Sequence, residues 1–462
     1  MTPSGRAARG APHGARSRWD AGEVAVVGLM RSGRAAAELL RRQGAAVYAS
    51  DVAATAAVRE NAAALEALGC AVQVGGHDLA RIARAAGVVA SPGVPPDAPP
   101  LAAARAAGVE VLAELELAVR SLPRTRLAVV TGTKGKSTTA ACLAHLLEAA
   151  GLTDVGAAGN IGFPASAVAL ADRPPAWLAV EASSFQLHDS PSLAPAVGVL
   201  TNLSADHLDR YGSEEAYYAD KALLFRNASA DSRWVLNADD EAVLALPGAA
   251  PGTRETFSLT QRAAAGFYDR AAGWLVLRGT PLMRRPDLAL LGEHNVANAL
   301  AAALAVPPDA DREVLARALT TFRPLSHRLE PVRELDGVLW INDSKATTLS
   351  AVAVALASVD RPAVLLLGGR PKVPSFAPLA PRLGRVRTVV AYGEAAPLIE
   401  RDLGGAAPVV REGGDFAAVL ARARGVARPG DAVLLAPACT SFDMFENAEE
   451  RGRRFRELVE AW

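Results

Sequence analysis

Residues 127–138 read LAVVTGTKGKST, a short apolar run followed by a glycine-rich turn. The apolar run predicts a buried strand, and the alanine-rich stretch that continues to about Ala150 predicts a helix. A glycine turn between a strand and a helix is typical of a phosphate-binding loop, whose backbone N–H groups and helix dipole cradle phosphate oxygens. The stretch therefore predicts an ATP site within an α/β fold.

The loop departs from the strict pattern at one position. Val130 stands where the first glycine belongs, and Gly132 supplies the turn instead. In such loops the lysine reaches the β- and γ-phosphates and the next hydroxyl binds Mg²⁺. The predicted ATP contacts here are Gly132, Thr133, Lys134, Gly135, Lys136, Ser137 and Thr138. A nucleotide-dependent binding or regulatory protein would carry the same loop, so the loop alone leaves the reaction open.

Strand and helix signals alternate on both sides of this loop. At roughly 150 residues per domain, a chain of 462 residues predicts about three domains. Strands separated by helices predict parallel sheets covered by helices. We therefore predict an α/β protein with three domains in series: a Rossmann-like domain at 21–122, a central P-loop ATPase-like domain at 123–324 and a Rossmann-like domain at 325–462. Residues 1–20 are predicted to form a disordered tail.

Short apolar runs mark the expected strands. They are Val24–Val27, Ala45–Ala49, Gly87–Ala90, Leu127–Val130, Leu178–Val180, Val197–Leu200, Trp234–Leu236, Val338–Ile341, Val364–Leu367, Thr388–Ala391 and Ala432–Leu435. Residues 257–277 predict short antiparallel strands. The last helix is predicted to begin near Ser441, a good capping residue, and to bury aromatic side chains that include Phe442 and Phe455.

Charge and composition exclude several classes of protein. Lysine plus arginine and aspartate plus glutamate both number 49, and the resulting zero net charge argues against a nucleic-acid coat or a basic membrane binder. No apolar run of the sequence approaches the ~18 residues that a membrane span needs. The three cysteines are too widely spaced for a disulfide framework or a zinc motif. We expect a cytoplasmic monomer without nucleic-acid or membrane partners.

Lysine is rare in this chain. All other basic residues are arginine, and the five lysines are Lys134, Lys136, Lys221, Lys345 and Lys372. This chain uses arginine at positions where only a positive charge is needed. We therefore expect the five lysines to lie at positions that need a primary amine, which arginine cannot replace.

The first domain carries glycines after its first strand, at Gly28 and Gly33. A dinucleotide fingerprint would also need glycine at position 30, which Met30 occupies, and an NAD-linked oxidoreductase is therefore disfavoured. Asp51 nevertheless lies at the end of the second strand, where an acid binds a ribose.

Several motifs together carry a resemblance to a known family. The loop resembles that of the Mur ligases and folylpolyglutamate synthetases, ATP-dependent enzymes that join an amine to a carboxylate. The motifs that favour the Mur ligases are GNIG (159–162), EASSFQL (181–187), DHLDRY (206–211), NDSKAT (342–347) and PACTSFDMF (437–445). The resemblance implies addition of D-glutamate to UDP-N-acetylmuramoyl-L-alanine through an acyl phosphate, in peptidoglycan precursor synthesis.

The resemblance also implies a metal and carbamate cluster. Lys136, Glu181, His207 and Lys221 would be catalytic, and two Mg²⁺ ions would be held by Ser137, Glu181, His207 and Lys221. CO₂ would carbamylate Lys221 and turn this cation into a carboxylate-like anion, which only a primary amine can become. Without the resemblance, His207 would be interpreted as an ordinary loop residue and Lys221 as a solvated surface charge.

Substrate-binding residues follow from the same resemblance. The UDP substrate would contact Arg31, Ser32, Asp51, Ser91, Pro92, Gly93, Asn160, Gln186 and His207. ATP would also contact Asn298 of the second domain and Arg328, Asp343 and Lys345 of the third. Glutamate would contact Thr347, Lys372, Ser441 and Phe442, which all lie on the third domain. The third domain would close onto the second. The chain departs from the family pattern at Thr348, Val373 and Ala448, around the glutamate pocket, so the residues leave the chirality of glutamate open.

Overall fold

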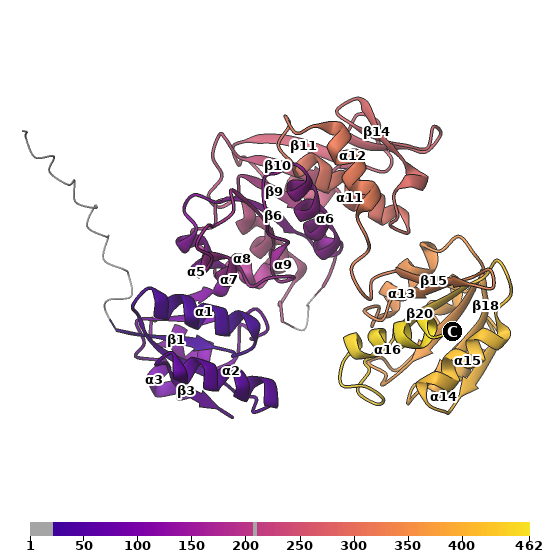
Figure 1. Ribbon diagram of the computed structural model, residues 1–462, viewed down its shortest axis with the longest axis horizontal. Helices are drawn as coiled ribbons and strands as arrows, with labels where there is room; N and C mark the ends of the chain where they lie inside the picture. Colours follow the sequence, from indigo (N-terminus) through magenta and orange to yellow (C-terminus); the bar gives the residue numbers. More distant parts are fainter. Residues whose placement is uncertain (1–21, 207–209) are drawn as a thin grey trace, which may run out of the picture. The chain divides into compact units, whose positions relative to one another are not determined.

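The computed structural model describes residues 22–206 and 210–462 (Figure 1). The predicted tail at 1–20 and His207 lie outside the described residues. The chain divides into two compact units, Met1–Glu255 and Thr256–Trp462. The strands of the described ranges form three sheets, which confirms the α/β class. None of the helices in those ranges is long and apolar enough to cross a membrane.

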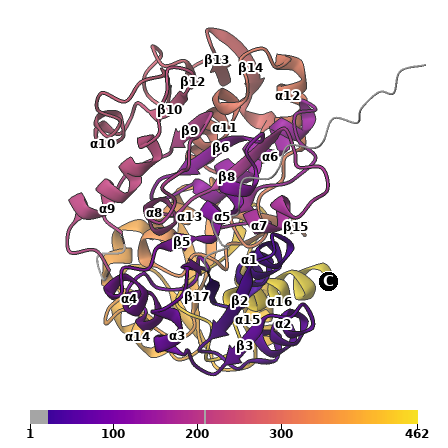
Figure 2. The same ribbon diagram turned by 90° about the vertical axis from the view of Figure 1, so that its left-hand side faces the viewer.

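The first sheet is parallel, with strand order β3-β2-β1-β4-β5. Its elements are β1 (Glu23–Val27), α1 (Arg31–Arg42), β2 (Ala46–Asp51), α2 (Ala56–Ala67), β3 (Ala71–Val74), α3 (Leu79–Ile82), β4 (Gly87–Ala90), α4 (Pro99–Ala106) and β5 (Val111–Ala113). Figure 2 shows α3 and α4 on one side of this sheet and α1 and α2 on the other. In such sheets ligands bind at the carboxyl ends where the strand order reverses, here between β1 and β4.

The second sheet carries the phosphate loop. Its order is β14-β13-β12-β11-β10-β9-β6-β8-β7, and the border between the two compact units falls within β11. The elements of its parallel part are α5 (Glu114–Ser121), β6 (Arg126–Thr131), α6 (Lys136–Ala149), β7 (Ala158–Gly159), α7 (Ala165–Ala169), β8 (Trp177–Glu181), α8 (Ser184–His188), β9 (Val197–Leu200), α9 (Glu214–Ala222), η1 (Leu223–Phe225), β10 (Arg233–Asn237) and α10 (Glu241–Ala245). The predicted strand positions in this part are confirmed.

A smaller ladder of strands follows. It comprises β11 (Thr253–Ser258), β12 (Gly266–Asp269), β13 (Trp274–Leu277), β14 (Thr280–Arg284) and η2 (Arg285–Asp287), and it leads into α11 (Glu293–Ala305) and α12 (Arg312–Thr321). The strands β12, β13 and β14 are antiparallel, as predicted for this stretch. The pairing of β11 with β12 is parallel, so the prediction of antiparallel strands was wrong for that pair.

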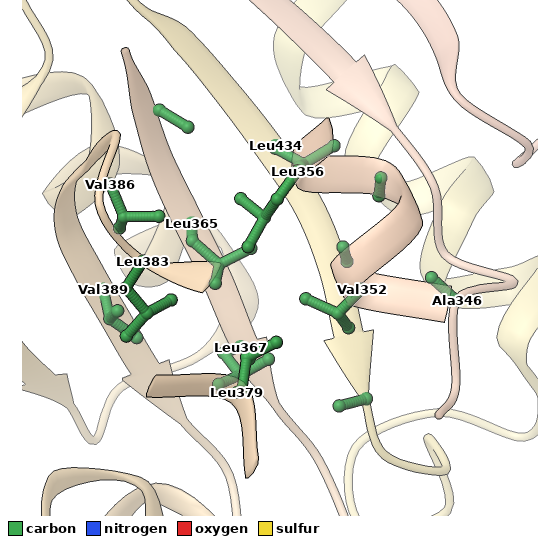
Figure 3. Close-up of a cluster of buried hydrophobic side chains, with 14 of the residues drawn as sticks. Ala346, Val352, Leu356, Leu365, Leu367, Leu379, Leu383, Val386, Val389 and Leu434 are labelled. Carbon is green, nitrogen blue, oxygen red and sulfur yellow. The ribbon is translucent and has the colours of Figure 1, made fainter. Parts of the chain in front are cut away.

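The third sheet has the order β15-β16-β20-β17-β18-β19, and all its pairs except β15–β16 are parallel. Its elements are β15 (Glu330–Leu335), β16 (Val338–Asn342), α13 (Leu349–Ala357), β17 (Ala363–Gly368), η3 (Ala377–Arg382), β18 (Val386–Tyr392), α14 (Ala396–Leu403), β19 (Val409–Glu412), α15 (Phe416–Val426), β20 (Ala432–Ala438) and α16 (Ala448–Glu460). Figure 3 shows Val352 and Leu356 of α13 packed against Leu365 and Leu434 of the sheet. This apolar core fixes the strand ends that carry the candidate site.

The last helix begins later than the sequence predicts. It starts at Ala448, and the Asn447 side chain caps it by accepting from the N–H of Glu450. Ser441 lies before it, in a turn whose N–H groups donate to the Ser441 carbonyl. Phe442 is 61% exposed, so the prediction that it is buried was wrong, whereas Phe455 is fully buried as expected. The capping preference of serine misled the prediction because the better-placed Asn447 follows six residues later.

Helix α5 contains a glutamate buried against the neighbouring α7. Glu114 is fully buried, and its Oε1 accepts from the N–H of Ser166 at 2.5 Å. Its other oxygen has no hydrogen-bond partner among the described residues. Burial raises the pKa of Glu114 to about 7, because the charged form loses its hydration.

We expect Glu114→Gln to change how stability depends on pH. The carboxyl has a pKa of 4.5 when unperturbed and about 7 when folded, so the folded state binds more protons between these values and its stability falls as pH rises through them. The loss from this one group is about 3 kcal/mol. Thermal unfolding midpoints from pH 4.5 to 8 should fall less steeply in the variant, and parallel curves for the two proteins would contradict this expectation.

Candidate active site

The phosphate loop lies between β6 and α6, as predicted. Gly135 caps α6 in the left-handed conformation (φ 82°), and Gly132 has a φ of 140°. A Cβ atom at Gly132 would lie 2.0 Å from Thr201 Oγ1, so no other residue fits there. The Lys136 ammonium donates to the carbonyl of Thr133 at 2.8 Å, which folds this side chain back over the loop.

Two residues that the sequence reasoning missed hold the loop in place. The Asn202 side chain accepts from the N–H of Lys134 and donates to its carbonyl, both at 2.9 Å. Thr201 Oγ1 donates to the same carbonyl at 2.7 Å. Both residues directly follow β9, the neighbour of β6. Their position at the end of a predicted strand was the feature of the sequence that could have identified them. The backbone of Lys134 is thus fixed while its side chain is exposed.

Lys221 is buried against this loop. It is 1% exposed, its Nζ donates to the carbonyl of Gly132 at 2.8 Å, and it lies 4.7 Å from the centre of the Tyr217 ring. Burial, together with the charge of Lys136, lowers the pKa of Lys221 to about 7. A solvated surface lysine would have neither property, so the structure contradicts that alternative interpretation of Lys221.

Glu181 lies beside the loop because β8 pairs with β6 so that Glu181 faces Val130. It is 1% exposed, and its Oε1 accepts from the Asn160 side chain at 3.2 Å. Its Oε2 is buried without a hydrogen-bond partner among the described residues. A cation would stabilise a buried carboxylate oxygen of this kind, and an oxygen ligand suits Mg²⁺.

The residues predicted to bind Mg²⁺ include types other than His, Cys, Asp and Glu, and only with these other types could they form a metal site. Within 22–206 and 210–462, no three His, Cys, Asp or Glu side chains lie close enough together to hold a metal ion. The predicted set also draws on Ser137, on Lys221 and on His207, which is outside the described residues. Glu181 is the member whose surroundings fit a cation.

A pocket in the first compact unit gathers part of the predicted UDP-substrate set. Its lining includes Ser91, Pro92 and Gln186, with Phe185 and Asp189. Gln186 lines this pocket, and its Nε2 is buried without a hydrogen-bond partner among the described residues.

Other members of that set contact the backbone. The two Asp51 carboxylate oxygens accept from the N–H groups of Leu29 and Ala53 at 2.7 and 2.8 Å, which ties together the loops that follow β1 and β2. Arg31 donates to the carbonyl of Gly162 at 2.9 Å. Ser32 and Gly93 lie in α1 and after β4, near the same strand ends.

The remaining ATP candidates lie in the second compact unit. Asn298 on α11 is buried and donates to Asn295 Oδ1 at 2.9 Å. Asp343 follows β16, and burial raises its pKa to about 6 although the Arg328 charge opposes this. Lys345 forms an ion pair with Glu449 at 2.6 Å.

The predicted glutamate contacts lie at the carboxyl ends of the third sheet. The Lys372 ammonium donates to Thr347 Oγ1 at 3.2 Å, and burial lowers the pKa of Lys372. Ser441 is buried and Phe442 is exposed after β20. The expected helix N-terminus at Ser441 is absent from this described stretch, so the electrostatic reason for anion binding there does not hold.

Arg451 is a further residue that the sequence did not single out. It is fully buried on α16 and donates to the hydroxyl and carbonyl of Ser344, both at 2.9 Å. It also donates to the carbonyls of Cys439 and Thr440 at 3.4 Å. The guanidinium therefore joins the loops after β16 and β20, which carry Thr347 and Ser441.

Comparison with known proteins agrees with this arrangement. The chain matches three families in series, described as Mur ligase MurD-like, N-terminal domain (22–113), Mur ligase middle domain (130–306) and Mur ligase, glutamate ligase domain (327–439). The UDP-N-acetylmuramoylalanine–D-glutamate ligase of Anaeromyxobacter dehalogenans is 43% identical over 94% of this chain and 97% of its own. That of Myxococcus xanthus is 42% identical over 95% and 98%.

Solved structures share the fold at lower identity. The UDP-N-acetylmuramate–alanine ligase of Thermotoga maritima has a TM-score of 0.60 at 21% identity, covering 95% of this chain and 99% of its own. A MurF structure from Acinetobacter baumannii has a TM-score of 0.58 at 16% identity, covering 94% and 93%. With three matched domains and relatives above 40% identity, the chain belongs to the Mur ligase family and, within it, to the UDP-N-acetylmuramoylalanine–D-glutamate ligases.

Proposed function

We propose that this protein joins D-glutamate to UDP-N-acetylmuramoyl-L-alanine with conversion of ATP to ADP and phosphate, in the cytoplasmic synthesis of peptidoglycan precursors. The observation that carries the proposal is the buried Lys221 amine bonded to the phosphate loop, beside a carboxylate with an unpartnered oxygen. In the proposed reaction, this site would bind the polyphosphate of ATP next to the carboxylate that attacks it. The names of the full-length relatives support the choice of substrates.

The reaction would proceed in two steps. The alanyl carboxylate attacks the γ-phosphate of ATP and forms an acyl phosphate while ADP leaves. The amine of glutamate then attacks the acyl carbon, and the tetrahedral intermediate releases phosphate. Catalysis would rest on positioning and on electrostatic stabilisation of the transferred group.

The phosphate loop would bind ATP through the backbone from Gly132 to Gly135 and through the side chains of Lys136 and Thr138. The Asn202 and Thr201 contacts fix this backbone before the nucleotide arrives, so little ordering remains to be done. Lys134 would add a second positive charge at the exposed edge of the loop. Asn298, Arg328, Asp343 and Lys345 would complete the nucleotide site.

Ser137, Glu181, His207 and Lys221 would hold two Mg²⁺ ions. When bound, these ions neutralise the charge that gathers on the transferred phosphoryl group. The uncharged Lys221 amine is well populated near pH 7, and this is the form that reacts with CO₂. Carbamylation would replace a second cation beside Lys136 with an anion, which relieves like-charge repulsion in a buried place.

The substrates would be recognised at separate positions. The UDP substrate would bind Arg31, Ser32, Asp51, Ser91, Pro92, Gly93, Asn160, Gln186 and His207. Glutamate would bind Thr347, Lys372, Ser441 and Phe442. We expect the enzyme to work as a monomer.

Release of ADP tests the proposed function directly. We expect ADP release that requires UDP-N-acetylmuramoyl-L-alanine and D-glutamate together, with much weaker release with L-glutamate or other amino acids. The measurement is a coupled assay with each substrate omitted in turn. ADP release that is independent of both acceptors would favour a nucleotide-dependent regulatory protein instead.

A further inference from the structure

Two residues that flank Arg328, just before the third sheet begins at β15, have an unusual backbone. His327 and Leu329 have φ values of 66° and 42°, in the left-handed region that non-glycine residues rarely adopt. Both side chains are buried, at 6% exposure each, whereas Arg328 between them is exposed. The two buried neighbours therefore anchor an arginine that faces outward.

This conformation is not that of an ordinary hairpin. Among the other positive-φ non-glycine residues of the described chain, Arg278 and Asp336 precede glycines in the tight turns of β13–β14 and β15–β16. Such turns demand positive φ. Residues 327–329 instead precede β15 and form no hairpin turn. The bond from the Arg328 N–H to the Leu325 carbonyl makes His327 the third residue of a β-turn, whereas Leu329 has its positive φ outside that turn. A strained residue such as Leu329 persists only where the surroundings enforce its backbone, and such residues gather at functional sites.

Hydrogen bonds hold every N–H of this segment. That of His327 donates to Glu330 Oε2 at 2.8 Å, that of Arg328 to the carbonyl of Leu325 at 3.1 Å, and that of Leu329 to Asp343 Oδ1 at 3.1 Å. The His327 carbonyl accepts from the N–H of Lys345 at 3.2 Å. The segment is therefore bonded directly to the loop after β16, which carries two other nucleotide candidates.

The His327 ring is fixed as well. Asn342 Nδ2 lies 3.0 Å from His327 Nδ1, and burial lowers the pKa of this imidazole. A neutral ring accepts the Asn342 hydrogen bond. A Cβ atom at Gly452 would lie 2.2 Å from the same nitrogen, so α16 approaches the ring closely only because residue 452 is glycine.

We propose that residues 327–329 form an arginine clamp, in which His327 and Leu329 are positioning residues that hold Arg328 toward the phosphates of ATP and couple it to Asp343 and Lys345. The inference rests on the proposed function for the role of Arg328. The strained backbone is confined to His327 and Leu329, the two neighbours of Arg328. At these two positions, a residue that tolerates the left-handed region should preserve the clamp, and a residue that resists this region should not.

The test compares His327→Val with His327→Asn. Both remove the imidazole, but a β-branched residue resists the left-handed region and asparagine tolerates it. We expect kcat/KM for ATP to fall about tenfold further in H327V than in H327N. Thermal unfolding checks that both variants are folded. If valine prevents folding, H327A serves as the milder strained variant.

A double-mutant cycle with Arg328→Ala separates the clamp from a merely structural turn. If the clamp acts through Arg328, the difference between H327V and H327N should vanish in the R328A background. An unchanged difference there, or equal activity of the two His327 variants, would overturn the clamp. The same cycle is also measured on the Kd for ATP by calorimetry. This binding measurement tests the clamp even if the wild-type chain releases no ADP with the proposed substrates. An absence of ADP release would refute the proposed function and leave the clamp to be judged by the Kd values.

Discussion

Lys221→Ala is expected to lower the rate of ligation by about a thousandfold or more. The substitution removes the amine that lies 2.8 Å from the phosphate loop and with it the proposed carbamate. Losing one preorganised charge at a phosphoryl-transfer site costs about a hundred- to a thousandfold, and this group would act on the metal ions as well. Steady-state ADP release under saturating substrates measures the loss.

Chemical rescue separates the carbamate from a simple cation. A small carboxylic acid should restore part of the activity of K221A, because it can occupy the space of the missing anion. Lys221→Arg is the matched control, since it keeps a positive charge but cannot be carbamylated, and it should be as inactive as K221A. Near-normal turnover in either variant would refute the proposed role of Lys221.

Glu181→Gln is expected to lower kcat about a hundredfold and to leave the protein at least as stable as the wild type. The amide keeps the shape and an acceptor for Asn160 but removes the charge that would face a cation. The wild-type oxygen is buried without a partner, so neutralising it removes a cost to folding. Activity measured against Mg²⁺ concentration and thermal unfolding give the two readouts.

Glu114→Gln is the matched control for this second prediction. Glu114 is also a buried glutamate with one unpartnered oxygen, but it lies on α5 and contacts Ser166. The Glu114→Gln enzyme should therefore keep the wild-type turnover, whereas the Glu181→Gln enzyme should lose it. Full activity of Glu181→Gln at every Mg²⁺ concentration would show that Glu181 holds no metal in this enzyme.

Local patterns predicted most of the framework. The apolar runs placed strands such as β4 and β9 at their observed limits, because burial between helices requires continuous apolar residues. Glycine-rich turns are equally local, so the phosphate loop from Thr131 to Ser137 could be placed by its context between strand and helix. Motif resemblance supplied the family, and the comparisons confirmed it.

The sequence by itself determined the α/β class, the phosphate loop and the family, since each depends on residues that are neighbours along the chain. Only the tertiary structure decided that the Asn202 side chain holds the phosphate loop by hydrogen bonds and that Lys221 is buried with a lowered pKa. It also decided that Phe442 is exposed and that the last helix starts only at Ala448. It also revealed the left-handed backbone around Arg328. These properties arise from desolvation and from contacts between distant segments, so they exist only once the strands are brought together.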